Sequence, residues 1–167
     1  MTETPDYGLL NSQTDERFGN RRFGRFGTIA QNGCGLIALY NIERAADDRT
    51  RFEPFCDAAK RIKTNLFGLL GTRPSSIPQN LKKDGFTVEK IPKKDIAQAA
   101  RFDGTVVLYW QWLSAHYVAG IGNEDGTYTF YNQFSTPRKM TLSEFLAYLE
   151  RSKLHTVRVW GIRFPQK

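Results

Sequence analysis

Apolar residues recur at helical spacing in the first half of the chain. An apolar run that follows Cys34 predicts a helix that ends near Ala46, just before Asp47 and Asp48. A second helix is indicated by apolar side chains at Phe52, Phe55, Cys56, Ala59 and Ile62, with Cys56 facing the core. A capping serine, an early proline and Gly85 bracket a short helix over residues 76–83.

The second half of the chain instead shows the patterns of strands. Strands are predicted over residues 86–91, 105–110, 114–122, 127–131 and 156–164. The turn Asp125-Gly126 joins two of them into a hairpin. A helical turn is expected over residues 96–100, and the capping box of Thr141 and Glu144 opens a helix through about Arg151. Helices followed by antiparallel strands predict an α+β fold.

Length and composition agree with one core preceded by a polar arm. The chain has 167 residues, of which 40% are hydrophobic and 13% aromatic, enough for a single domain over residues 28–167. Residues 1–27 are polar and glycine-rich and repeat Arg-Phe-Gly three times. Arginine interleaved with phenylalanine can bind single-stranded nucleic acid. We favour an extended arm whose phenylalanines dock on its own domain or a partner and which covers the thiol.

Charge and cysteine content indicate which partners and which cellular compartment to expect. The formal net charge of +7 favours an anionic partner, such as an acidic protein, a nucleic acid or a membrane surface. The N-terminus lacks a basic region followed by an apolar run, so no signal peptide is expected. No apolar run approaches the length of a membrane span. With two cysteines only, we expect reduced thiols and a cytoplasmic protein, unless a specialised secretion route delivers it.

Cys34 lies between Gly33 and Gly35, where an irregular segment becomes an apolar helix. Unpaired N–H groups and the positive end of a helix dipole stabilise a thiolate at such a position and lower its pKa. A small buried cysteine that begins a core helix is the alternative. The motif by itself leaves both interpretations open.

His116 and Asn132 supply what a nucleophilic cysteine needs. His116 opens one strand of the predicted hairpin and Asn132 ends the other, so the two residues come near each other at its open end. An imidazole must hold one nitrogen toward the sulfur, and the side-chain carbonyl of Asn132 can fix the tautomer of the other. Each residue alone could be an ordinary strand or turn residue. Their joint occurrence in the order Cys, His, Asn favours a catalytic triad.

These motifs resemble the papain-like cysteine peptidase superfamily, and within it the small bacterial peptidases of the C39-like, bacteriocin-processing type. The resemblance implies a papain-like α+β fold, with Cys34 at the start of the central helix as nucleophile, His116 as base and Asn132 as orienter. It implies no metal and no cofactor. These enzymes carry an oxyanion-hole glutamine further upstream of the cysteine than Gln31, but Gln31 could still donate its amide there.

The sequence therefore predicts a cysteine hydrolase, a peptidase or amidase, that acts through an acyl-thioester. Trp110 and Trp112, just before His116, could line the groove for a peptide or protein substrate, which the basic charge suggests is acidic. One alternative is a toxin or effector domain that modifies a macromolecule as a deamidase, acyl transferase or RNase, with an immunity or inhibitor protein as partner. Another is a non-catalytic module that binds protein or, less favoured, nucleic acid.

Overall fold

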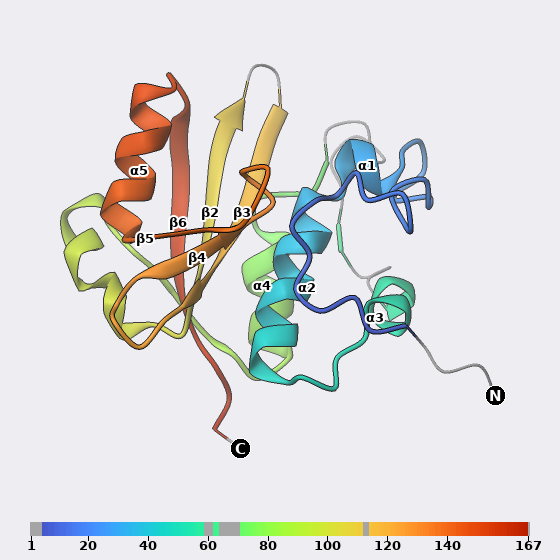
Figure 1. The fold of residues 1–167 in the computed structure, drawn as a ribbon, viewed down its shortest axis with the longest axis horizontal. Helices are drawn as coiled ribbons and strands as arrows, with labels where there is room; N and C mark the ends of the chain where they lie inside the picture. The colour runs from blue at the N-terminus through green and yellow to red at the C-terminus, as the bar shows by residue number, and fades with distance from the viewer. Residues whose placement is uncertain (1–4, 59–61, 64–70, 112–113, 167) are drawn as a thin grey trace.

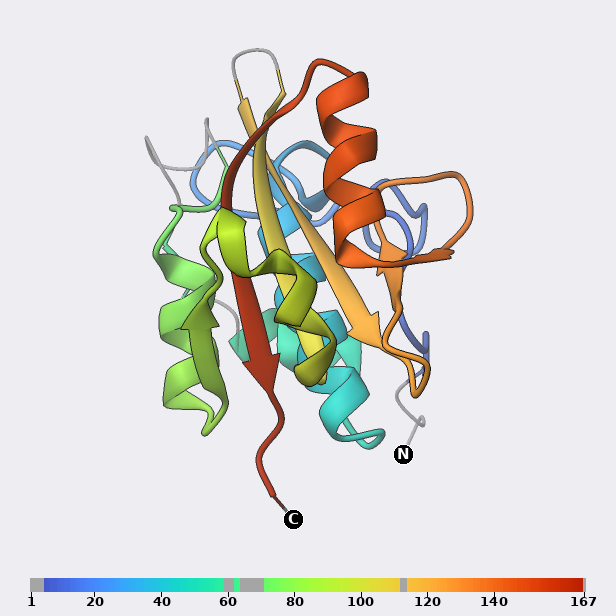
Figure 2. The same ribbon diagram turned by 90° about the vertical axis from the view of Figure 1, so that its left-hand side faces the viewer.

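The computed structural model describes residues 5–58, 62–63, 71–111 and 114–166. An antiparallel sheet lies between two groups of helices (Figure 1). One group comes from the N-terminal half of the chain and comprises α1 (Ile29–Asn32), α2 (Cys34–Ala46), α3 (Phe52–Ala58) and α4 (Ser76–Lys83). The other group comprises the 3-10 helix η3 (Lys93–Arg101) and α5 (Leu142–Arg151), which lie together on the opposite face (Figure 2).

Over the described residues, the sheet has six strands in the order β1-β6-β2-β3-β4-β5. They are β1 (Thr87–Lys90), β2 (Gly104–Gln111), β3 (Ser114–Gly122), β4 (Tyr128–Tyr131), β5 (Arg138–Met140) and β6 (His155–Arg163). The last strand of the chain, β6, inserts between β1 and β2, so the C-terminal segment lies inside the sheet. β3 pairs with β2 along its whole length, but with β4 only from Ala119 onward.

The central strand β2 explains why helices cover both faces. Val106 and Leu108 pack in the cluster on the α2 side, whereas Val107 and Tyr109 pack in the cluster on the α5 side. A strand that buries both faces reads as a continuous apolar run, which is the pattern of residues 105–110. The expectation of a buried strand is confirmed.

Most predicted elements are present with nearly the predicted bounds. α2 ends at Ala46, and Thr141 and Glu144 form both hydrogen bonds of the capping box of α5. The predicted helical turn near Ile96 is the 3-10 helix η3. Two short elements, α1 and β5, were not predicted, because they have four and three residues and no clear apolar period. Of the residues assigned to the second helix, Ala59 lies outside the described residues, and Ile62 lies in a bend and not in a helix.

The N-terminal arm is held against the core. Leu10 is 2% exposed, and its backbone N–H and C=O bond the buried side chain of Asn41 at 2.8 Å each. Phe18 and Phe23 are also buried in the cluster on the α2 side, while Phe26 is exposed. Two phenylalanines of the repeat therefore dock on the chain's own core, where they are not available to stack on bases. Among the described residues, no helix has the length and apolar character to span a bilayer.

Candidate active site

Cys34 is the first residue of α2, directly after the N-cap Gly33, and is 5% exposed. Its position gives the sulfur the N–H groups and the dipole of the helix start. Gly35 is required by packing, because a Cβ at this position would lie 2.5 Å from the Oγ1 atom of Thr72. The glycine that follows the cysteine thus lets the segment at Thr72 pack directly against the start of the helix.

The thiol faces the part of β3 that β4 leaves uncovered. The Sγ atom of Cys34 lies 4.0 Å from the carbonyl oxygen of Ala115, and the backbone N–H of Tyr117 points toward the sulfur. The ring of His116, between them in sequence, lies close enough to the thiol to lower its pKa. The packing of α2 against β3 therefore brings Cys34 and His116 together.

The His116 ring is fixed from its other side by Asn132. The Nε2 atom lies 2.8 Å from the backbone carbonyl oxygen of Asn132. A carbonyl oxygen only accepts hydrogen bonds, so Nε2 carries the hydrogen and Nδ1 is left to face the thiol. From the sequence, this role was expected of the side chain of Asn132. The structure corrects that assignment: Asn132 has a φ of 61°, and this left-handed turn directs its main-chain carbonyl toward the ring.

The side chain of Asn132 binds the N-terminal arm instead. Its Oδ1 accepts from the backbone N–H of Gln13 at 3.1 Å, and its Nδ2 donates to Oε1 of Gln13 at 3.2 Å. The backbone N–H of Asn132 donates to Oδ1 of Asn11 at 3.1 Å, and Nδ2 of Asn11 donates to the carbonyls of Phe134 and Ser135. The arm thereby holds the turn that orients His116.

Neighbouring groups shift the pKa values of both Cys34 and His116. Burial raises the pKa of the Cys34 thiol. The hydrogen-bonding and charge effects of His116 lower this pKa, as do the N–H groups of Tyr117 and Gly35. Together these effects outweigh burial, and the net shift is downward. Burial lowers the pKa of His116, but the adjacent thiolate and the Asn132 carbonyl raise it above its usual value. Both shifts act in the direction that stabilises a thiolate beside an imidazolium.

Of the other predicted site residues, the structure describes Gln31 and Trp110. Gln31 is exposed, and its Oε1 accepts from the backbone N–H of Thr28 as part of the capping box of α1. This bond uses the acceptor oxygen of the amide, whereas the predicted oxyanion role requires its Nε2 donor, so that role stays a prediction. Trp110 is 50% exposed on β2, paired with Ala115 of β3. Trp112 lies outside the described residues.

The structure adds residues that the sequence analysis did not select. Tyr109 packs edge-on against the His116 ring at 5.4 Å between centroids, and its hydroxyl donates to Gln133 at 2.6 Å. Asn11 and Gln13 hydrogen-bond Asn132, although they lie about 120 positions away in sequence. The pairing of Tyr109 with His116 follows from the predicted adjacent strands, whereas no local signal connects the arm with Asn132.

No family model matches this chain, and no curated protein matches it. Among solved structures, the chain is similar to the crystal structure of the peptidase domain of Streptococcus ComA, a bi-functional ABC transporter involved in a quorum-sensing pathway. The TM-score is 0.53 at 16% sequence identity, and the match covers 80% of this chain and 91% of that domain. This likeness confirms the predicted fold: α+β, with helices packed on an antiparallel sheet as in that peptidase domain.

Proposed function

We propose that this chain is a papain-like cysteine hydrolase that cleaves an amide bond, with Cys34 as nucleophile and His116 as base. The observation that carries the proposal is the Cys34–His116 pair, in which the Asn132 carbonyl fixes the imidazole tautomer. The similar domain of Streptococcus ComA is a peptidase domain, so we place peptide bonds before other amides as substrates.

The first half-reaction follows from the positions of these groups. Nδ1 of His116 takes the thiol proton, and the Cys34 sulfur forms a bond to the substrate carbonyl carbon. The backbone N–H of Cys34 at the helix start is the donor we assign to the developing oxyanion. When the C–N bond breaks, the His116 imidazolium gives its proton to the leaving amine, and the acyl group remains on sulfur as a thioester.

Water completes the reaction. Neutral His116 removes a proton from water, the oxygen attacks the thioester carbonyl, and the C–S bond breaks. The products are a carboxylic acid and the Cys34 thiolate beside imidazolium, which restores the starting pair. The Asn132 carbonyl keeps the ring in one orientation through both steps, because Nε2 retains its hydrogen throughout.

A mixture of fluorescence-quenched peptides tests the proposal. We expect the wild-type protein to release fluorescence and to accumulate a thioester of Cys34 that mass spectrometry detects after an acid quench. The Cys34→Ala and His116→Ala variants should do neither, while Cys56→Ala should behave as wild type. Turnover that persists in Cys34→Ala would contradict the proposal.

A further inference from the structure

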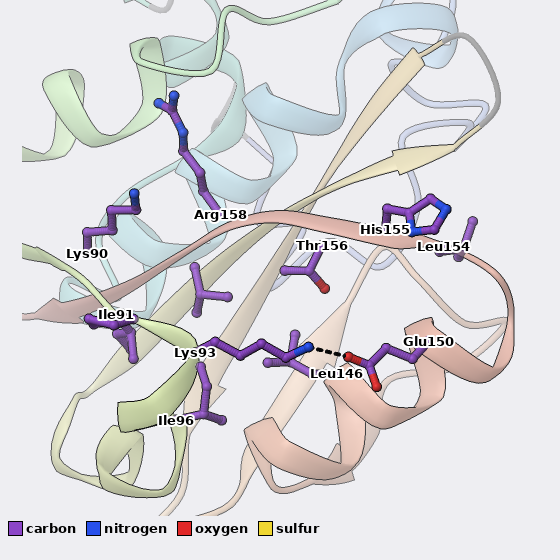
Figure 3. A pocket seen from close by; sticks show the side chains of 12 residues that line it. Lys90, Ile91, Lys93, Ile96, Leu146, Glu150, Leu154, His155, Thr156 and Arg158 are labelled. Carbon is purple, nitrogen blue, oxygen red and sulfur yellow. Dashed lines mark hydrogen bonds and ion pairs between the residues drawn. The ribbon is translucent and has the colours of Figure 1, made fainter.

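A hollow lies at the edge of the sheet where β1 ends. It has a volume of about 370 Å³ and is bounded by the segment after β1, the start of β6, η3 and α5 (Figure 3). Its apolar side chains come from Ile91, Ile96, Leu146, Leu154 and Val159. Sites of this size and apolar character bind small molecules or several side chains of a peptide. None of these residues belongs to the Cys34 site.

The backbone of β6 is uncovered along this hollow. β1 pairs with β6 only as far as Lys90, opposite Trp160, and the last contact is the hydrogen bond from the Ile91 N–H to the Val159 carbonyl at 2.9 Å. After Ile91 the chain turns away into η3. Among the described residues, no strand pairs with this edge of β6 over residues 155–158. Such an edge can accept another strand.

Side chains on the two sides of this edge differ in character. Arg158 pairs with Leu108, and Lys90 pairs with Trp160, both of the cluster on the α2 side, so Lys90 and Arg158 point to the α2 side of the edge. His155 points the same way, and Thr156 points to the opposite, apolar side (Figure 3). The edge thus has a basic side and an apolar side.

The charges around the hollow leave the basic side without an acidic partner. Lys93 and Glu150 neutralise each other at 2.9 Å on the apolar side. Lys90 and Arg158 are exposed and make no ion pair with the described residues. Carboxylates placed opposite these two cations would complement them.

We propose that the free edge of β6 binds an extended peptide segment of another protein that alternates acidic and apolar side chains. Strand addition supplies main-chain hydrogen bonds, and the period of two directs alternate side chains to opposite sides. The acidic side chains face Lys90 and Arg158, and the apolar ones enter the hollow at Ile96 and Leu146. A second copy of this chain fits less well, because two β6 edges would bring Lys90 and Arg158 against like charges.

Fluorescence anisotropy tests the proposal with the Cys34→Ala variant, so that binding does not depend on turnover. The probe is a labelled, capped eight-residue peptide that alternates glutamate and valine. We expect saturable binding that weakens about tenfold or more in Lys90→Glu/Arg158→Glu, since two attractive pairs become repulsive. The matched control, Lys82→Glu/Lys83→Glu on α4, changes the net charge equally and should leave the affinity within about twofold.

Two altered probes test the geometry. A peptide with the same composition in two blocks, four glutamates and then four valines, should bind at least about tenfold more weakly, and so should an alternating peptide N-methylated at every second amide. Equal binding of all three peptides would show general charge attraction and overturn the proposal. Equal weakening in Lys90→Glu/Arg158→Glu and in Lys82→Glu/Lys83→Glu would do the same. Absence of binding, or a dimer of this chain that forms through β6, would overturn it as well.

Discussion

The two cysteines of this chain lie in opposite electrostatic surroundings. Burial raises the pKa of both thiols. At Cys34, His116 and backbone N–H groups outweigh burial, and the net shift is downward. At Cys56, on α3, the side chain of Arg21 lowers the pKa, but burial and the carboxylates of Asp57 and Glu53 prevail, and the net shift is upward.

The difference shows that a cationic neighbour does not by itself make a thiol reactive. Arg21 lies beside Cys56, yet its guanidinium forms an ion pair with Glu53 at 2.5 Å. His116 lies beside Cys34 with its other nitrogen bonded to a neutral carbonyl, so its charge is available to the sulfur. The charge of the group that binds the cation therefore decides how strongly the cation stabilises the thiolate.

Removal of the nucleophile should have the largest effect. Cys34→Ala should lower the turnover of any peptide that the protein cleaves by about 10³-fold or more, because the covalent route is lost. Cys56→Ala should retain wild-type turnover. Steady-state kinetics on the same peptide check both variants, and an equal loss in the two would remove the distinction between the thiols.

His116→Ala should have the next largest effect. Only the backbone N–H groups of Tyr117 and Gly35 then oppose the effect of burial, so the pKa of Cys34 rises, and the thiolate fraction at pH 7 falls about tenfold for each unit of pKa gained. We expect alkylation of Cys34 by iodoacetamide to slow by at least about tenfold, with the circular dichroism spectrum unchanged. His155→Ala is the control, and a similar slowing in that variant would show that His116 is not the partner.

Gly35→Ala tests the packing at the start of α2. The added Cβ meets Thr72 at 2.5 Å, so the variant should lose about 1–3 kcal/mol in the free energy of unfolding. Denaturant titration measures the loss. Gly126→Ala, in the hairpin turn, is a less informative comparison because its φ of 79° adds backbone strain. A wild-type stability for Gly35→Ala would mean that the segment at Thr72 does not pack against the helix.

The arm should have a moderate effect on turnover. Asn11→Ala/Gln13→Ala removes hydrogen bonds that hold Asn132, so the His116 ring loses its fixed orientation, and we expect kcat to fall about tenfold with KM nearly unchanged. Arg22→Ala, which changes an exposed residue of the same arm, should leave kcat unchanged. A rise in KM with constant kcat in the double variant would assign the arm to substrate binding instead.

Glu53→Gln should have the smallest effect, and it tests why the pKa of Cys56 differs from that of Cys34. Loss of the carboxylate removes a charge that raises the pKa of Cys56 and frees the guanidinium of Arg21. Alkylation of Cys56 at pH 7 should become a few times faster, while Cys34 should keep its rate. Mass spectrometry of the two cysteine-containing peptides measures both rates, and slower alkylation of Cys56 would contradict this explanation of its pKa.

More of the fold than of the candidate site could be predicted from the sequence. α2, the β3–β4 hairpin and α5 were predictable because each has a local signal: an apolar run, an Asp-Gly turn and a capping box. β5 has no such signal, since its residues are mostly exposed and it is held by pairing with β4.

Within the site, residue types were predictable but contacts were not. The order of Cys34, His116 and Asn132 indicated a nucleophile, a base and an orienting group, and the structure brings these three residues together. The sequence did not reveal that Asn132 uses its main chain, because that depends on a φ of 61°. Nor could local patterns connect Asn11 and Gln13 with Asn132, since those contacts form only when the arm docks.

The pH dependence of alkylation at the two cysteines tests the central claim most directly. Because the pKa of Cys34 is lowered, its thiolate persists below the ordinary thiol pKa of about 8.5, and its rate should fall only on acidification through that lowered value. Because the pKa of Cys56 is raised, its rate should increase only above the ordinary value. We predict that the two profiles of rate against pH are separated, and that the Cys34 profile moves to higher pH in His116→Ala. Coincident profiles, or a Cys56 thiolate that forms at lower pH than that of Cys34, would contradict the assignment of Cys34 as the nucleophile.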